Sequence, residues 1–195
     1  FPLSLILDHT GIYYDGSNSS DVEVAIQRPL TTEQIELAEK IALLWKKSNV
    51  SKYNHAPDIK DAKLNQLTDG KPFVLLIDQT MGDASIQHGQ ASESSFEQML
   101  RTALNHPNLP KLLIKLHPEV VSGKKQGYLS KLLKKNEFAN SEQISIIDLD
   151  IHLPSLIAKA TAVYTVTSQS GFEALIYGIP VYTFGMPFYA GWGLT

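Results

Sequence analysis

The sequence predicts an α/β fold built on a doubly wound, parallel β-sheet. Between residues 71 and 184, short and almost continuous apolar runs alternate with segments of helical periodicity. Strands of a parallel sheet that is covered on both faces have this continuous apolar character, and a helix joins each strand to the next. Each run also ends in a polar or glycine-containing loop. Ligands of such sheets bind beyond the carboxyl ends of the strands, so these loops are the expected site.

The elements follow from the apolar pattern. Residues 94–104, with Phe96, Met99, Leu100 and Leu104 on one face, predict an amphipathic helix. Further helices are expected over 128–134 and 154–160 and from Phe172 to the glycine at 178. The five strands are expected over residues 73–77, 112–116, 144–147, 162–166 and 181–184.

The first 70 residues have a different pattern. The segments Leu3–Asp8 and Ile12–Tyr14, separated by Gly11, predict two strands. Thr31 and Thr32 predict a helix N-terminus, and the helix extends to about Lys47. Residues 48–70 are polar and predict a connector. We therefore expect residues 1–70 to be the end of one domain with a linker, and residues 71–195 to form a second domain.

Composition excludes several classes of function. The 195 residues carry a net charge of −3, which argues against nucleic acid as a partner. No cysteine is present, so disulfide scaffolds and thiol nucleophiles are excluded and a reducing compartment is favoured. No apolar run approaches the roughly 20 residues of a transmembrane helix. The start at Phe1 has neither an initiator Met nor a signal-peptide pattern, which predicts a piece of a longer protein.

Polar side chains follow four of the predicted strands. Asp78 and Asp83 follow the first strand, and each could cap a turn instead of serving a ligand. His117 follows the second strand in the sequence Lys115-Leu116-His117-Pro118. The proline holds the histidine backbone extended, which favours a ring turned toward the crevice, although an ordinary surface histidine fits as well.

The loop after the fourth strand points to a phosphate site. Thr167-Ser168-Gln169-Ser170-Gly171 precedes a predicted helix, and three of these five residues carry hydroxyls. Backbone N–H groups at a helix N-terminus bind phosphate, and hydroxyls add donors. An ordinary N-cap explains one hydroxyl but does not need three. The fifth strand leads into an aromatic and glycine-rich loop at 184–193.

Other ligand motifs are missing. The sequence has no G-x-G-x-x-G fingerprint, no Walker lysine motif and no H-E-x-x-H. Its six histidines are scattered without metal-ligand spacing, so we expect no metal and no other cofactor. The lysines at 124, 125, 131, 134 and 135 fit a solvated helix face better than an acidic membrane surface.

Taken together, these motifs resemble the bacterial capsule polysaccharide β-Kdo transferases. The similarity covers nearly the whole chain in order, including the N-terminal Leu7–Asp15 and Ser51-Lys52-Tyr53-Asn54. The motifs that carry it are Asp78-Gln79-Thr80-x-x-Asp83, Lys115-x-His117-Pro118, Thr167-Ser168-Gln169-x-Gly171-Phe172-Glu173-Ala174-Leu175 and the string from Phe184 to Thr195.

The resemblance implies a GT-B fold of two Rossmann-like domains, with residues 71–195 as part of the C-terminal, nucleotide-sugar-binding domain. It implies CMP-Kdo as donor and a retaining reaction without metal. The acceptor would be a lysophosphatidylglycerol carrying a Kdo linker, handled in the cytoplasm at the periphery of the inner membrane. The capsule biosynthesis and export machinery would be a further partner.

The resemblance also suggests roles for particular residues. Asp83 would be the nucleophile, because retention usually takes two displacements through a carboxylate. His117 and Ser168 would hold the phosphate of CMP as it departs. Glu173 would accept a hydrogen bond from the ribose or the cytosine. Further binding positions are Gln79, Thr80, Lys115, Pro118, Thr167, Gln169 and Gly171, and residues 52–54 would reach the cleft from the linker.

One family motif and two rival functions limit this interpretation. The family's acidic pair followed by glycine lies upstream of the segment that begins at Phe1, so this piece alone would bind nucleotide weakly and turn over little. A sialic-acid or polyol-phosphate type of GT-B transferase, with a CMP- or CDP-linked donor, would also use the His-Pro and serine motifs but would not need Asp83. A non-catalytic nucleotide-binding or scaffold module is the other alternative.

Overall fold

The computed structural model describes residues 6–106, 111–139 and 141–195, and the central element in them is a five-stranded parallel sheet. The strands lie in the order β3-β2-β1-β4-β5. Their bounds are β1 (Phe73–Ile77), β2 (Lys111–Lys115), β3 (Ile144–Ile147), β4 (Ala162–Thr165) and β5 (Val181–Thr183). The predicted α/β class with a doubly wound parallel sheet is confirmed.

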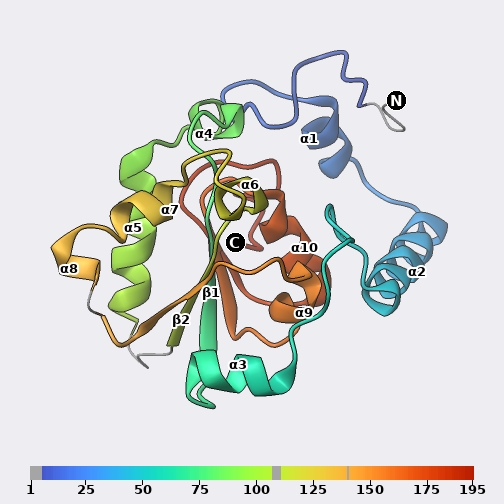
Figure 1. Ribbon diagram of the computed structural model, residues 1–195. Helices are drawn as coiled ribbons and strands as arrows, with labels where there is room; N and C mark the ends of the chain where they lie inside the picture. The colour runs from blue at the N-terminus through green and yellow to red at the C-terminus, as the bar shows by residue number, and fades with distance from the viewer. Residues whose placement is uncertain (1–5, 107–110, 140) are drawn as a thin grey trace.

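Helices cover both faces of the sheet, because alternate residues of each strand point to opposite faces. Leu76 and Ile114 face a core cluster with α5 (Glu93–Leu104) and α7 (Tyr128–Leu132). Leu75 and Leu113 face a second cluster with α9 (Leu153–Ile157) and α10 (Gln169–Tyr177). Figure 1 shows these two helix pairs on opposite sides of the sheet.

The remaining helices are mostly short, and the sequence pattern did not predict several of them. Helices of four to six residues complete too few turns to show a periodic apolar face. The short helices that the pattern did not predict are α1 (Asp21–Ile26), α4 (Ala84–His88), α6 (Pro118–Val121) and α8 (Asn136–Ala139). The predicted helix from Thr32 is present as α2 (Thr32–Ser48), which begins at Thr31 with a capping box.

The strands predicted for the N-terminal region are absent from its described residues. Residues 12–14 form no strand, and the described part of 3–8, residues 6–8, forms none either; residues 3–5 lie outside the described residues. Aspartate side chains accept from the backbone here, since Asp8 takes the N–H groups of Thr10 and Gly11. These local bonds replace a strand ladder.

The segment 48–70, predicted as a connector, contains a helix that the sequence pattern did not indicate. This segment contains α3 (Asp61–Thr68), whose Leu64 joins the core cluster on the α9–α10 face of the sheet together with Ile59. The domain boundary placed near residue 70 stays a prediction.

The topology places one crevice at the middle of the sheet. From β1 the chain moves outward through β2 to β3, and it then returns to the other side of β1 as β4. The loops after β1 and β4 therefore leave in opposite directions and open a crevice between them. None of the helices among the described residues is both long enough and apolar enough to cross a bilayer.

Candidate active site

A cavity of about 280 Å³ lies at the carboxyl ends of the strands. Loops that follow β1, β2, β3, β4 and β5 all contribute to its wall, together with two segments from the first 70 residues. From the N-terminal region come Tyr13 and Tyr14, and from the segment after α2 come Ser51, Lys52 and Tyr53. The cavity thus joins residues that are far apart in the sequence.

Asp83 lines this cavity from the loop after β1 and also begins α4. Its Oδ1 accepts from the backbone N–H of Ser85 at 3.0 Å, the bond expected of an N-cap. Its Oδ2 accepts a long hydrogen bond, 3.4 Å, from the Gln79 side chain. Because Oδ1 caps the helix, the orientation of the Asp83 carboxylate at the cavity wall is fixed.

Asp78, five residues earlier, is a buried carboxylate with a different set of partners. It is 1% exposed and accepts from the backbone N–H groups of Gln79, Leu129 and Ser130. Burial raises the pKa of this carboxyl to about 6, and the N–H donors oppose the shift. Asp78 therefore joins the end of β1 to the start of α7, and the turn-capping interpretation applies to it.

Gln79 joins the loops after β1 and β4. Its Nε2 donates to Thr167 Oγ1 at 3.0 Å, and its Oε1 accepts from the Thr167 backbone N–H at 3.0 Å. Ser85 Oγ also lies 3.0 Å from Thr167 Oγ1. Gln79 and Thr167 are both buried, so these bonds hold the two loops at a fixed separation across the crevice.

His117 enters the cavity from the end of β2. The backbone N–H of Glu119 donates to its Nδ1 at 3.2 Å, which makes Nδ1 the acceptor and leaves the ring hydrogen on Nε2. Burial lowers the pKa of His117, Glu119 opposes this shift, Lys52 adds to it and Asp83 opposes it. His117 can thus donate a hydrogen bond through Nε2, and the charges of Lys52 and Asp83 shift its pKa in opposite directions.

Lys115 and Pro118 flank this histidine in the cavity wall. Lys115 is 6% exposed, and its Nζ donates to the carbonyl oxygens of Leu116 and Leu149. It therefore ties the loops after β2 and β3 together, and burial lowers its pKa. Pro118 is the first residue of α6. A backbone N–H at this position has no partner within the helix, so the missing N–H of proline costs no hydrogen bond.

Ser168 begins α10 at the opposite wall of the crevice. Its Oγ accepts from the backbone N–H of Ser170 at 3.3 Å, so it is the N-cap. Gln169 and Ser170, the first residues of this nine-residue helix, also line the cavity. The helix start presents N–H groups and the positive end of its dipole to the cavity, which is an arrangement suited to an anion.

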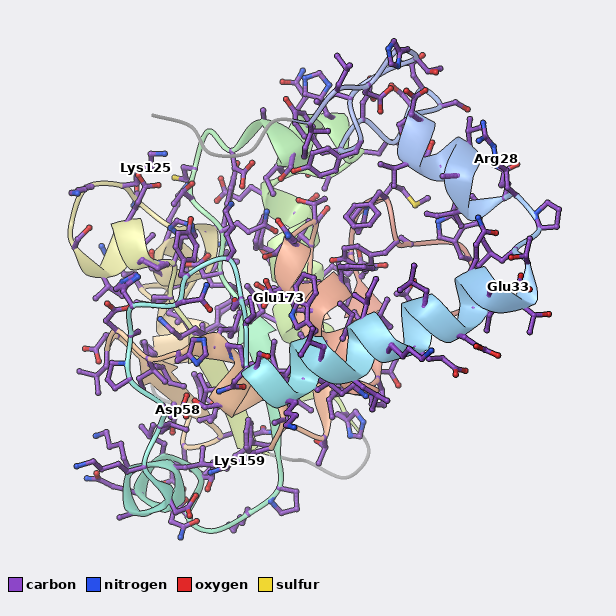
Figure 2. The ribbon with its side chains drawn as sticks, turned by 90° about the vertical axis from the view of Figure 1, so that its right-hand side faces the viewer. Arg28, Glu33, Asp58, Lys125, Lys159 and Glu173 are labelled. Atoms are coloured by element: carbon purple, nitrogen blue, oxygen red, sulfur yellow. The ribbon has the colours of Figure 1, made fainter. Side chains whose placement is uncertain are left out.

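Glu173 lies in α10 behind this helix start and is 2% exposed (labelled in Figure 2). Its Oε2 accepts from Ser51 Oγ at 2.7 Å, and its Oε1 accepts from the Lys52 backbone N–H at 3.4 Å. Burial raises its pKa, and the hydrogen bond from Ser51 opposes this shift. Both carboxylate oxygens of Glu173 therefore accept hydrogen bonds from the segment after α2.

The cavity lining includes most of the predicted site residues. It contains Lys52, Tyr53, Gln79, Asp83, Lys115, His117, Pro118, Thr167, Ser168, Gln169 and Glu173.

Three predicted residues are not part of this lining: Asn54, Thr80 and Gly171. Thr80 is buried and forms a bridge with Gly127. A Cβ on Gly171 would come within 2.3 Å of the Tyr189 hydroxyl oxygen, so this glycine permits close packing.

Sequence reasoning assigned no role to several residues of the wall. Asp150 lies in the loop after β3 and lines the cavity, as do Tyr14 and Phe188. The rule that polar residues after each strand form the site would have found Asp150 had it been applied to the third strand. The tyrosines gave no such signal, because only the folded chain brings residues 13–14 to the sheet edge.

Within the described ranges, no group of three or more histidine, aspartate or glutamate side chains is arranged to hold a metal ion. The expectation that the reaction uses no metal stays a prediction.

The sequence matches the family described as "Capsule polysaccharide biosynthesis protein" over residues 2–195. Among curated proteins, the capsule polysaccharide modification protein LipA of Neisseria meningitidis serogroup B is 41% identical over 196 residues. The lipopolysaccharide-processing protein LpsZ of Rhizobium meliloti is 34% identical over 201 residues. All of this chain is covered in both alignments, but it spans 27% of LipA and 43% of LpsZ.

Solved structures give the same result. The β-Kdo 2,4 transferase KpsC of Thermosulfurimonas dismutans superposes on this chain with a TM-score of 0.87 at 38% identity, covering all of this chain and 58% of that one. The corresponding "beta Kdo 2,7 transferase" superposes with a TM-score of 0.68 at 28% identity, covering all of this chain and 56% of that one. The family resemblance seen in the motifs is confirmed: the chain belongs to the capsule polysaccharide biosynthesis protein family.

Proposed function

We propose that this chain is the donor-binding part of a β-Kdo glycosyltransferase of capsule polysaccharide biosynthesis. The observation that carries the proposal is the single cavity lined by Asp83, His117 and Ser168 at the sheet's switch point. The similarity to a solved β-Kdo 2,4 transferase over the whole chain supports the same class of reaction. CMP-Kdo is the donor we propose, since its nucleoside monophosphate would place one phosphate group at this crevice.

The phosphate of CMP would lie between His117 and the start of α10. The Nε2–H of His117 is the donor left for a ligand, because Nδ1 already accepts from Glu119. From the other wall, the helix start at Ser168 offers N–H groups and a favourable dipole. Donors on both sides of a departing phosphate stabilise the charge that it gains as its bond to the sugar breaks.

Asp83 would act as the nucleophile of a retaining mechanism. Its carboxylate attacks the anomeric carbon of Kdo, the bond from that carbon to the phosphate oxygen breaks, and CMP leaves with the electron pair. A hydroxyl of the acceptor then attacks the same carbon, loses its proton to a base, and displaces Asp83. Two inversions at one centre give net retention.

The acceptor we propose is a lipid-anchored Kdo linker of the lysophosphatidylglycerol type, met at the cytoplasmic periphery of the inner membrane. This part of the proposal is supported by the family relationship, which links the chain to capsule polysaccharide. Vesicles that carry a synthetic Kdo-lipid acceptor, incubated with CMP-Kdo and the full-length protein, test it by the appearance of the extended product.

The experiment for the donor site is a titration of the full-length protein with CMP and CMP-Kdo, followed by thermal unfolding. A ligand at 100 times its Kd stabilises the folded state by about 2.7 kcal/mol. The variant His117→Ala should weaken this stabilisation, while His9→Ala, at an exposed histidine outside the cavity lining, should leave it unchanged. No stabilisation by either ligand at millimolar concentration would instead favour a scaffold module.

A further inference from the structure

The segment Ser51–Asn54, here called the strap, crosses from the end of α2 to the cavity wall. It is a tight turn held by its own hydrogen bonds: the Ser51 N–H donates to Asn54 Oδ1 at 2.8 Å, and the Asn54 amide donates to the Ser51 carbonyl. Side chains that bond their own backbone in this way fix a turn without a strand or helix. The strap therefore has a definite shape of its own.

Two residues of α10 anchor the strap and the residues before it. Glu173 accepts from the Ser51 hydroxyl and the Lys52 N–H, and four residues later the Tyr177 hydroxyl donates to Asn49 Oδ1 at 2.9 Å. Residues four apart lie on the same face of a helix. One face of α10 thus holds the chain from the end of α2 to the strap.

The position of Glu173 requires an explanation. A carboxylate that is 2% exposed loses its hydration, so its burial is unfavourable unless protein groups replace the water. Here the groups that replace it are the hydroxyl of Ser51 and the N–H of Lys52. Both oxygens of Glu173 are therefore used to hold the strap.

The strap carries Lys52 and Tyr53, which both line the cavity. The Lys52 Nζ lies 5.5 Å from the centre of the Tyr53 ring, and that ring stands edge-on to His117 with centroids 6.1 Å apart. The Lys52 charge also contributes to lowering the pKa of His117. The strap thus brings a cation close to the imidazole at the proposed phosphate position.

Two lysines line this cavity, and their ammonium groups differ in the partners they have within the protein. The Nζ of Lys115 is occupied by two backbone carbonyls, whereas Lys52 forms no ion pair with a carboxylate among the residues that the structure describes. Three aspartates of the lining, Asp78, Asp83 and Asp150, would repel an anionic ligand. Lys52 is the cation available to offset them.

We propose that Glu173 is a positioning residue, which holds the strap so that Lys52 meets the phosphate of the bound nucleotide and Tyr53 closes the cavity beside it. Glu173 would then act on the phosphate through the strap, without touching the ribose or the base. This inference rests on the proposed function, because it takes a nucleotide monophosphate as the ligand of the cavity.

Calorimetric titration of the full-length protein with CMP and with cytidine tests the role of the phosphate. Lys52→Met should weaken CMP binding about tenfold or more, the loss expected for a charge-assisted hydrogen bond, and leave cytidine binding unchanged. Glu173→Gln and Ser51→Ala should show the same selectivity with smaller losses. Because both substitutions act through the position of the Lys52 ammonium, Glu173→Gln should weaken CMP binding little further in a protein that already carries Lys52→Met. Tyr177→Phe, which removes only the second anchor, the hydroxyl that bonds Asn49 before the strap, should show the same selectivity with the smallest loss.

Deoxy analogues separate positioning from direct contact. If Glu173 holds the strap, Glu173→Gln weakens CMP, 2′-deoxy-CMP and 3′-deoxy-CMP by the same factor. If Glu173 binds a ribose hydroxyl, the loss disappears for the analogue that lacks that hydroxyl, and the inference is overturned. Hydrogen exchange gives a readout without ligand: Glu173→Gln should speed exchange at the strap amides and leave the amides of β1 unchanged.

The two failures can be told apart. Wild-type protein that binds neither CMP nor CMP-Kdo overturns the proposed function and the ligand part of this inference together. Wild-type protein that binds CMP, combined with a Glu173→Gln loss that is equal for CMP and cytidine, overturns the inference alone. Ser51→Ala keeps the test valid if the Glu173 variant does not fold, since it breaks the same contact from the strap side.

Discussion

The strand-end loops contain two sets of polar residues that come from the same motifs but lie at different depths. Asp83, His117 and Ser168, the outer set, are half-buried in the cavity wall, whereas Asp78, Gln79 and Glu173, the inner set, line the same cavity but are almost fully buried. The side chains of the outer set keep atoms that can bind a ligand, whereas those of the inner set use theirs in hydrogen bonds to the protein. One motif can therefore contain both groups that are free to bind a ligand and groups that hold those side chains in place.

The largest expected effect tests the outer set at Asp83. Asp83→Asn should lower Kdo transfer by the full-length protein about 10⁴-fold, because an amide cannot form the covalent intermediate. Asparagine is as good an N-cap as aspartate, so α4 and the melting temperature should be preserved. Near-normal transfer by this variant would remove the nucleophile assignment and favour a transferase of the sialic-acid or polyol-phosphate type.

His117 is the next test of the outer set. His117→Asn should reduce kcat about 10²-fold, since it removes the Nε2–H that would stabilise the departing phosphate. The asparagine oxygen can still accept from the Glu119 N–H and start α6, which makes His117→Ala the comparison that also loses the cap. Equal activity in the asparagine variant and the wild type would assign His117 a capping role alone.

Asp78 tests the inner set through pH. Because burial raises its folded pKa to about 6 from 3.8, the folded state favours its protonated form. Its stabilising contribution is thus fully present below pH 3.8, falls as pH rises toward 6, and is constant above that. The change amounts to about 3 kcal/mol. Urea unfolding from pH 4 to 7 should show this slope in the wild type, and Asp78→Asn should flatten it. A variant with an unchanged slope would contradict the prediction.

The smallest effect concerns the bridge between the loops after β1 and β4. Gln79→Ala leaves the buried N–H and hydroxyl of Thr167 without their partner, so the free energy of unfolding should fall by about 2 kcal/mol. Substrate affinity should weaken only through the loop separation. Chemical denaturation measures the stability, and Gln87→Ala, an exposed glutamine of α4, is the control. A larger loss in kcat than in stability would move Gln79 to the outer set.

The apolar pattern was sufficient to predict the sheet. Each strand from β1 to β5 lies within a residue or two of its expected range, because buried parallel strands require continuous apolar runs. The predicted convergence of strand-end loops follows from the same rule, since carboxyl ends of parallel strands share one edge. The helices α1, α4, α6 and α8 and the aspartate-bonded turns near residue 8 gave no periodic signal, and the sequence pattern did not predict them.

The amino-acid sequence is sufficient to predict the fold class, the family and the loops that line the cavity. Which residues of those loops face the cavity depends on contacts between distant parts of the folded chain. The Glu173–Ser51 bond joins positions 122 residues apart, and the Gln79–Thr167 bonds join positions 88 apart. Such pairs leave no trace in local periodicity, because each partner's neighbours in the chain are set by its own helix or strand. Whether a carboxylate acts on a ligand or holds a segment depends on what the folded chain brings against it.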